Sequence, residues 1–141
     1  MNFWDTSALV PLIVEQELSS LAEDKYRLER GGVFVWWGTY TECVSALARL
    51  ERAQALTSRE AEQALRALRK LAETWHEIQP SDLVRDKANR LLRLHSLRTG
   101  DAFQLASAII ASEDLTSKVT FVTFDERLAA AARKEGFEVM D

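Results

Sequence analysis

The sequence has few of the side chains that build disulfides or zinc sites. It contains one cysteine, Cys43, and two histidines, His76 and His95. A single thiol forms no internal disulfide, as is usual for proteins of a reducing compartment. No cysteine and histidine spacing corresponds to a zinc site. We expect Cys43 to lie in the core and the two histidines to be surface or packing residues.

Long apolar runs are also missing. No stretch approaches the roughly 18 apolar residues that cross a bilayer. The first ten residues, MNFWDTSALV, lack the basic region and the long apolar stretch of a secretory signal. There are no internal repeats, low-complexity segments or linkers. We therefore expect a cytoplasmic protein without membrane contact, folded as one domain over residues 1–141.

Positive charge is in the minority. The chain has 18 Lys and Arg against 22 Asp and Glu, for a formal net charge of −4. This balance argues against a protein that binds nucleic acid by charge alone. It does not exclude a nuclease, because several of the acids would then hold a metal ion. Hydrophobic residues make up 47% of the sequence, which is ordinary for a globular domain.

Along the chain, short apolar runs alternate with segments whose apolar residues have helical spacing. The runs predict strands at Met1–Trp4, Val33–Trp36, Glu77–Gln79, Val119–Thr123 and Phe137–Val139. Helices are predicted at Ala8–Val14, Glu17–Arg30, Glu42–Arg52, after Thr57, at Asp82–His95, after Thr99 and at Arg127–Lys134. This alternation is typical of a three-layer α/β/α fold with a mainly parallel central sheet.

Three helix starts carry specific expectations. Thr6 or Ser7 is expected to cap the first helix, and Thr41 is expected to cap the helix that begins with Glu42 after a turn at Thr39–Thr41. Thr57 and Glu60 have the spacing of a capping box.

The segment from Thr99 to Ala111 is apolar on nearly all sides, which indicates a buried helix. Asp101 lies in its first turn, where free N–H groups and the helix dipole favour a carboxylate. The simplest interpretation is that Asp101 only caps this helix. Three further acids at strand ends or helix starts favour a functional role: Asp5, Glu42 and Asp125.

In a parallel sheet, sites form outside the carboxyl ends of the strands, so these four acids can converge. Unpaired carboxylates repel and raise one another's pKa values, and a divalent cation relieves this. Oxygen ligands without Cys or His favour Mg²⁺ or Mn²⁺, and phosphodiester hydrolysis suits such a site. Nearby hydroxyls would hold metal-bound waters, and Arg98 would contact a substrate phosphate. The hydroxyls are those of Thr6, Ser7 and Thr123.

Several motifs together resemble the PIN domain, and among PIN proteins the VapC-type toxin ribonucleases of toxin–antitoxin pairs. They are DTSAL from Asp5, the helix opened by Glu42, GDAFQLA from Gly100, and TFDERL from Thr123 with GFEV from Gly136. The resemblance covers the whole chain, although the middle region matches only in helical character. It implies a Mg²⁺-dependent endoribonuclease with Asp5, Glu42, Asp101 and Asp125 as its acidic site. It also implies an RNA substrate, a cognate antitoxin and a homodimer.

Two alternatives remain open. One is a catalytically silent PIN-like binding module, which would not need Mg²⁺. The other is a different metal-dependent phosphate-transfer protein. A haloacid-dehalogenase-like phosphatase needs a second Asp where Ser7 stands, and a receiver domain needs an acidic pair that this chain lacks after its first strand.

Three surfaces are expected to bind partners. Helices Glu17–Arg30 and Glu42–Arg52 are expected to flank the acidic cleft and to bind an amphipathic antitoxin segment, whose Arg would reach the carboxylates. The regions Leu83–Leu94 and Asp101–Ala111 are apolar enough to contribute to a dimer. Of Trp36 and Trp37, we expect one in the core and one partly exposed, where it can stack on an unpaired base.

Overall fold

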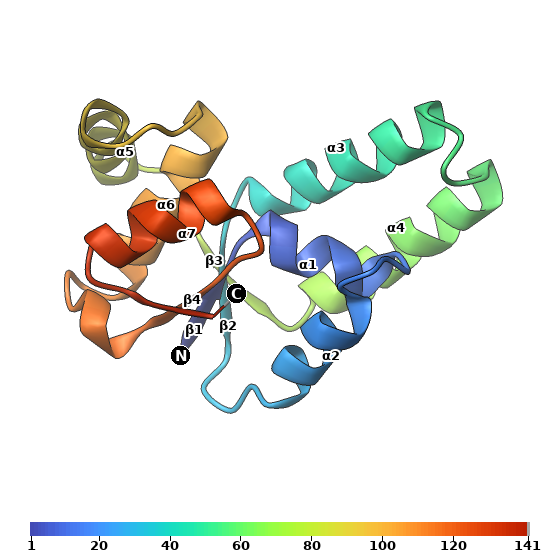
Figure 1. Ribbon diagram of the computed structural model, residues 1–141, viewed down its shortest axis with the longest axis horizontal. Helices are drawn as coiled ribbons and strands as arrows, with labels where there is room; N and C mark the ends of the chain where they lie inside the picture. Colours follow the sequence, from blue (N-terminus) through green and yellow to red (C-terminus); the bar gives the residue numbers. More distant parts are fainter. Residues whose placement is uncertain (141) are drawn as a thin grey trace.

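A computed structural model describes residues 1–140 and contains one five-stranded sheet (Figure 1). The strand order is β3-β2-β1-β4-β5, and every pairing among the described strands is parallel. The strands are β1 (Asn2–Trp4), β2 (Val33–Trp36), β3 (Trp75–Ile78), β4 (Thr120–Val122) and β5 (Glu138–Met140). The predicted α/β fold is confirmed, and its sheet is entirely parallel in the described part.

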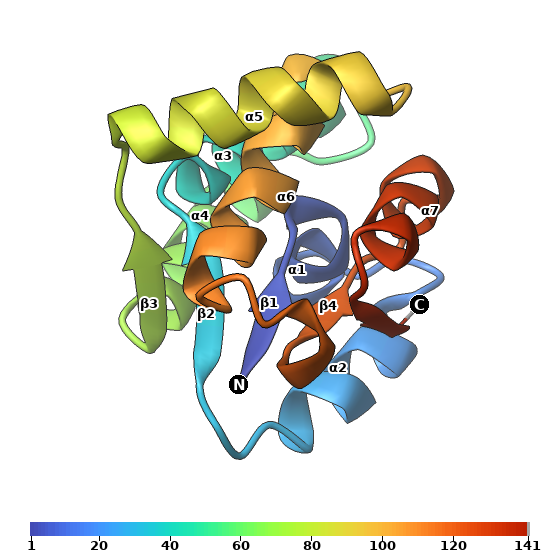
Figure 2. The ribbon, with the colours of Figure 1, turned by 90° about the vertical axis from the view of Figure 1, so that its left-hand side faces the viewer.

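Helices cover both faces of the sheet, as Figures 1 and 2 show. One face packs against α1 (Thr6–Ile13), α3 (Thr39–Arg52) and α4 (Ser58–Ala72), with α2 (Ser19–Arg27) beside α1. The other face packs against α5 (Asp82–Leu94), α6 (Thr99–Ala111) and α7 (Glu126–Lys134). Alternating side chains explain the two cores, because Phe3 points to the α6 side and Trp4 to the α1 side. No helix within residues 1–140 is long and apolar enough to cross a bilayer.

Helix α6 is the buried helix that its composition predicts. It lies against β2 on one side and is covered by α5 on the other. Seven of its residues are buried, from Ala102 to Ile109, with only Phe103 in that span partly exposed. Since α5 already covers α6, the apolar residues of Asp101–Ala111 belong mostly to the core. The expectation that this segment contributes a dimer surface is therefore wrong for most of it.

Two helices at the carboxyl edge begin earlier than predicted. Helix α1 begins at Thr6 with Asp5 in the cap position, so neither Thr6 nor Ser7 is the cap. Helix α3 begins at Thr39 after Gly38, so Thr39–Thr41 is helical and Thr41 is not the cap. The N–H of Glu42 donates to the carbonyl of Gly38 at 3.0 Å, which closes the first turn. Glycine is required there because a Cβ on Gly38 would collide with the indole nitrogen of Trp36.

Other boundaries differ by a few residues. Strand β3 begins at Trp75 and ends at Ile78, because its pairing with β2 starts opposite Val33. Helix α2 is shorter than the predicted Glu17–Arg30 segment. The capping box of Thr57 and Glu60 is confirmed, with both reciprocal hydrogen bonds present.

Candidate active site

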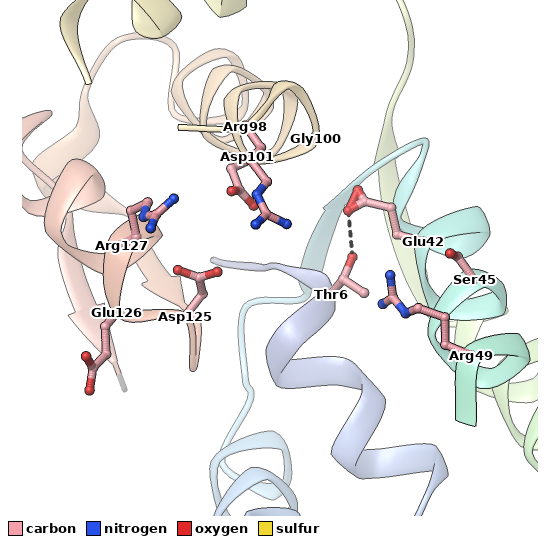
Figure 3. A pocket seen from close by; sticks show the side chains of 10 residues that line it. All are labelled: Thr6, Glu42, Ser45, Arg49, Arg98, Gly100, Asp101, Asp125, Glu126 and Arg127. Atoms are coloured by element: carbon pink, nitrogen blue, oxygen red, sulfur yellow. Dashed lines mark hydrogen bonds between the residues drawn. The ribbon is translucent and has the colours of Figure 1, made fainter. Parts of the chain in front are cut away.

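A cleft of about 820 Å³ opens at the carboxyl edge of the sheet (Figure 3). The edge is formed where β1 and β4 end and where α1, α3, α6 and α7 begin. The free N–H groups of four helix starts therefore lie at the same edge. The lining residues are Thr6, Glu42, Ser45, Arg49, Arg98, Gly100, Asp101, Asp125, Glu126 and Arg127.

Three of the four acids singled out in the sequence line this cleft. Figure 3 shows Glu42 on α3, Asp101 on α6 and Asp125 before α7 around one opening. Asp5 lies behind the lining and is only 4% exposed, although its neighbour Thr6 faces the cleft. The charge of Asp125 still acts on the Asp5 carboxyl.

Burial dominates the electrostatics of Asp5. Desolvation raises its pKa to about 7, with a smaller contribution from the Asp125 charge. The Ser7 hydroxyl donates to Asp5 Oδ1 at 2.8 Å, and hydrogen bonds from Ser7 and Thr123 partly lower the pKa. Repulsion between carboxylates is the cause of raised pKa values that the sequence predicts. For Asp5 the larger cause is its removal from water.

Glu42 is held by two neighbouring elements. Thr6 Oγ1 on α1 donates to Glu42 Oε1 at 3.2 Å, and Gln104 Nε2 on α6 lies 3.3 Å from both carboxylate oxygens. Desolvation raises the pKa of Glu42, the hydrogen bonds of Gln104 and Thr6 lower it, and the Asp101 charge raises it. Glu42 is thus an acceptor fixed in place and directed into the cleft.

Gln104 and Thr39 support this arrangement from the core. Gln104 is 1% exposed, and its Nε2 also lies 2.9 Å from Thr39 Oγ1 and 3.1 Å from Thr6 Oγ1. Its Oε1 has no partner within the described residues. No role for Gln104 is predicted from the sequence, although it stands three residues after Asp101 and so lies on the same side of α6.

Asp101 and Asp125 both line the cleft, and their negative charges repel each other. The pKa of Asp101 is raised by desolvation and by the Asp125 charge. A backbone hydrogen bond from Arg98 and the charges of Arg98 and Arg127 lower it. Asp125 Oδ1 accepts a hydrogen bond from the N–H of Leu128 at 2.9 Å, so this carboxylate also caps α7.

Three arginines bring positive charge to the same cleft. Arg98, predicted as a phosphate contact, lines it together with Arg49 and Arg127. Arg49 is not among the residues predicted from the sequence. Helical spacing would have found it, because Ser45 and Arg49 stand three and seven residues after Glu42 on one face of α3.

Ser7, at the start of α1, and Thr123, which follows β4, lie below the lining and join these two elements. Their hydroxyls are 3.1 Å apart, and Ser7 Oγ accepts from the N–H of Phe124 at 2.9 Å. Thr123 Oγ1 accepts from the N–H of Asp125 at 3.0 Å. These contacts fix the positions of Asp5 and Asp125.

The remaining polar candidates lie outside the cleft. His95 is paired with Glu135 at 2.7 Å, and His76 stacks on Phe34 with ring centroids 4.9 Å apart. Cys43 is buried in the core, where desolvation raises its pKa to about 12. These positions agree with the expectation of a core cysteine and of histidines that are surface or packing residues.

The donor set of the cleft fits a hard divalent cation. Its acids are oxygen ligands, three of the four have raised pKa values, and a cation would stabilise their charged forms. In the arrangement described for residues 1–140, no three acidic, His or Cys side chains are close enough together to hold a metal ion. The chemistry of the ligands therefore fits, while their grouping is not that of a closed coordination shell.

The molecule is an α/β/α domain with an acidic cleft at the carboxyl edge of a parallel sheet. The family model described as PIN domain matches residues 3–134. The chain belongs to the PIN-domain family.

Solved structures show the same fold. One described as FitAcB from Neisseria gonorrhoeae has a TM-score of 0.73 and 15% identity, covering 100% of this chain and 97% of that one. A toxin–antitoxin complex from Klebsiella pneumoniae has a TM-score of 0.69 and 15% identity, with the same coverage. Mycobacterium tuberculosis VapC20, described as a sarcin-ricin loop cleaving toxin, has a TM-score of 0.69 and 19% identity, covering 97% of this chain and 96% of that one. A comparison with curated proteins found no match.

Proposed function

We propose that this protein is a Mg²⁺- or Mn²⁺-dependent endoribonuclease and the toxin of a toxin–antitoxin pair, acting in the cytoplasm. The observation that carries the proposal is the cleft in which Glu42, Asp101 and Asp125 meet three arginines within a PIN-domain fold. The similar structures named above include a toxin–antitoxin complex and an RNA-cleaving toxin, and they support the same function.

The cleft residues divide into two chemical roles. Asp5, Glu42, Asp101 and Asp125 would hold the metal ion, which supplies an activated water and stabilises the leaving oxygen when bound. Arg49, Arg98 and Arg127 would bind the phosphates on either side of the scissile bond.

Three further residues position these groups. Thr6 orients Glu42 by donating to its carboxylate, while Ser7 and Thr123 hold Asp5 and the backbone at Asp125. Ser7 and Thr123 therefore act on the metal site through Asp5 and Asp125. A role for any of these hydroxyls in holding a metal-bound water remains part of the proposal.

Cleavage of total RNA with and without Mg²⁺ tests this function. We expect cleavage in Mg²⁺ or Mn²⁺, none with EDTA, and none in Asp101→Asn. Asp24→Asn, an exposed acid paired with Arg27 on α2, is the matched control and should cleave normally. Activity that persists in EDTA or in Asp101→Asn contradicts the proposed site.

A catalytically silent PIN domain is the second candidate. The observation that favours it is the lack of three grouped ligands in residues 1–140. Calorimetric Mg²⁺ titration separates the two candidates. A nuclease should bind Mg²⁺ in the wild type and lose that binding in Asp101→Asn, whereas a silent module should show no difference.

The proposed antitoxin would dock beside the cleft. Helix α3 borders the cleft with Glu42, Ser45 and Arg49, as expected. Helix α2 contributes no lining residue because it packs outside α1, which corrects the expectation that it flanks the cleft. Leu47 on α3 is buried, whereas Leu21 and Leu28 at α2 are exposed and available to an amphipathic partner. Co-expression with a small protein encoded next to this chain tests the pairing by co-purification and inhibition.

A homodimer is also part of the proposal. Leu83 and Leu94 are exposed at the two ends of α5, with Leu92 near the second. Exposed leucines of this size favour contact with another surface. Sedimentation of the wild type and of a Leu83→Ser, Leu94→Ser variant measures whether α5 carries the contact.

A further inference from the structure

A second pocket, lined by aromatic rings, lies at the same edge of the sheet. Its volume is about 440 Å³, and it is formed where β2 ends, where α5 begins and by one residue of α6. Its lining residues are Trp36, Trp37, Pro80, Ser81, Asp82, Val84, Arg85 and Phe103. It shares no lining residue with the acidic cleft.

The rings of this pocket are held in fixed positions. Phe103 and Trp36 are stacked, with centroids 5.2 Å apart and planes at 6°. Trp37 meets Trp36 edge to face, with centroids 6.3 Å apart and planes at 75°. The N–H of Trp37 donates to the carbonyl of Ile78 at 3.0 Å, which ties its backbone to β3.

Trp37 is nevertheless half exposed. Its relative exposure is 52%, whereas that of Trp36 is 9%. A large ring with a fixed backbone and a free face loses little freedom when a flat ligand stacks on it. Trp36 belongs to the core below Trp37, and Phe103 packs against that core.

The pocket lies next to the cleft along the chain as well as along the sheet. Trp37 immediately precedes Gly38, whose carbonyl accepts from the N–H of Glu42. The backbones of Trp37 and Glu42 are separated by one residue and one helical turn, which is at most about 10 Å. We expect a strand with one phosphate in the cleft to reach Trp37 with a neighbouring nucleotide.

We propose that Trp37 and its pocket form a subsite for an unpaired nucleobase of the RNA substrate. An aromatic face accepts any base by stacking, and single-stranded RNA is recognised in this way. Arg85 and Asp82, paired at 3.1 Å on the rim, place a donor and an acceptor near the edges of a stacked base. This inference rests on the proposed ribonuclease function, and it selects unpaired rather than double-stranded substrates.

The test combines protein variants with altered substrates. The probe is a fluorescein-labelled oligoribonucleotide that spans a site cleaved by the wild type, or an unstructured twelve-nucleotide RNA if no site is found. Fluorescence anisotropy in Mg²⁺ measures RNA binding by proteins that also carry Asp101→Asn and so do not cleave the probe. Initial rates measure cleavage by the same Trp37 variants without Asp101→Asn. Trp37→Ala should weaken binding about tenfold and raise KM by a similar factor, with a smaller change in kcat. Trp37→Phe should restore most of the loss.

An abasic substitution at each nucleotide in turn locates the stacked base without a protein variant. At one nucleotide position, the abasic substitution should weaken binding by the wild type as much as Trp37→Ala weakens binding of the intact RNA. The same abasic substitution should not weaken binding by Trp37→Ala any further. Leu115→Ala, which changes an apolar side chain of similar exposure (51%), is the matched control and should bind as the wild type does.

The outcomes separate this inference from the function on which it rests. If the wild type neither binds nor cleaves RNA, the proposed function fails and the subsite fails with it. If the wild type binds and cleaves RNA but Trp37→Ala binds equally well, only the subsite is overturned. The subsite is also overturned if no abasic position matches the loss of affinity in Trp37→Ala. A Trp37→Ala variant that changes sedimentation but not RNA binding would assign the pocket to a protein contact and would also overturn it.

Discussion

The side-chain nitrogen of Gln104 lies 3.3 Å from both carboxylate oxygens of Glu42. This contact joins the buried helix α6 to the start of α3, two elements separated by 62 residues in the chain. The same nitrogen reaches Thr6 and Thr39, so three helix starts meet at one amide. Gln104 therefore fixes where Glu42 points without itself lining the cleft.

Gln104→Met should move the pH dependence of cleavage. The hydrogen bond from Gln104 lowers the pKa of Glu42, so its loss raises that pKa further. Metal binding needs the ionised carboxylate, and the acidic limb of the profile of kcat/KM should therefore shift to higher pH. We expect about tenfold lower activity below neutral pH, with recovery at higher pH.

The control for this change is Gln63→Met, the same substitution at an exposed position of α4. Its pH profile should match the wild type. Thermal unfolding of both variants confirms that they are folded. A profile of Gln104→Met that is lower at every pH but unshifted would show a role in packing instead.

Asp5→Asn should stabilise the metal-free protein near neutral pH. The folded state holds the Asp5 proton up to about pH 7, whereas the unfolded chain releases it near the ordinary value of 3.8. Between these values the folded state binds more protons, so the free energy of unfolding falls as pH rises. Asparagine does not titrate, so Asp5→Asn should avoid this fall in the free energy of unfolding, which is roughly 1 to 4 kcal/mol across this window.

Urea unfolding in EDTA at pH 5 and pH 8 measures this effect. The wild type should lose stability between the two values, and Asp5→Asn should lose less. Added Mg²⁺ at pH 8 should stabilise the wild type more than the variant. Equal pH slopes for the two proteins would show that Asp5 is already ionised in the fold.

Substitutions of Asp125 should separate its role as the cap of α7 from its role in RNA cleavage. Its Oδ1 accepts from the N–H of Leu128, and an asparagine oxygen can keep this bond while removing the charge. Asp125→Asn should lose cleavage but keep its melting temperature, whereas Asp125→Ala should lose both, with about 1 kcal/mol of stability. Thr57→Ala, which removes the cap of α4, provides the comparison with a lost cap and normal cleavage.

Arg98→Gln should weaken substrate binding through lost charge. Arg98 lines the cleft and also lowers the pKa of Asp101. We expect KM to rise roughly fivefold to tenfold and the slope of log KM against log salt to decrease by about one. Arg66→Gln, on the exposed side of α4, should leave both values unchanged. An unchanged salt slope in Arg98→Gln would exclude a phosphate contact.

The layered α/β architecture follows from local patterns of the sequence, because apolar content and periodicity are properties of each segment. The apolar run from Ala102 to Ile109 predicts its own burial wherever it packs. The positions of Asp5 and Asp125 after strands, and of Glu42 and Asp101 in first turns, place them at one sheet edge once the sheet is parallel. Alternation along β1 likewise separates Phe3 from Trp4.

How these groups meet depends on tertiary packing. Helix starts moved by two or three residues because Asp5 and Gly38 occupy the cap positions, which depends on how β1 and β2 leave the sheet. Asp5 is buried behind the cleft, where Ser7 of α1 donates to it and Thr123, which follows β4, lies beside Ser7. Contacts such as Gln104 with Glu42, or Trp37 beside Phe103 in one pocket, join segments far apart in sequence. No local pattern carries that information, since the relative placement of helices depends on packing across the whole sheet.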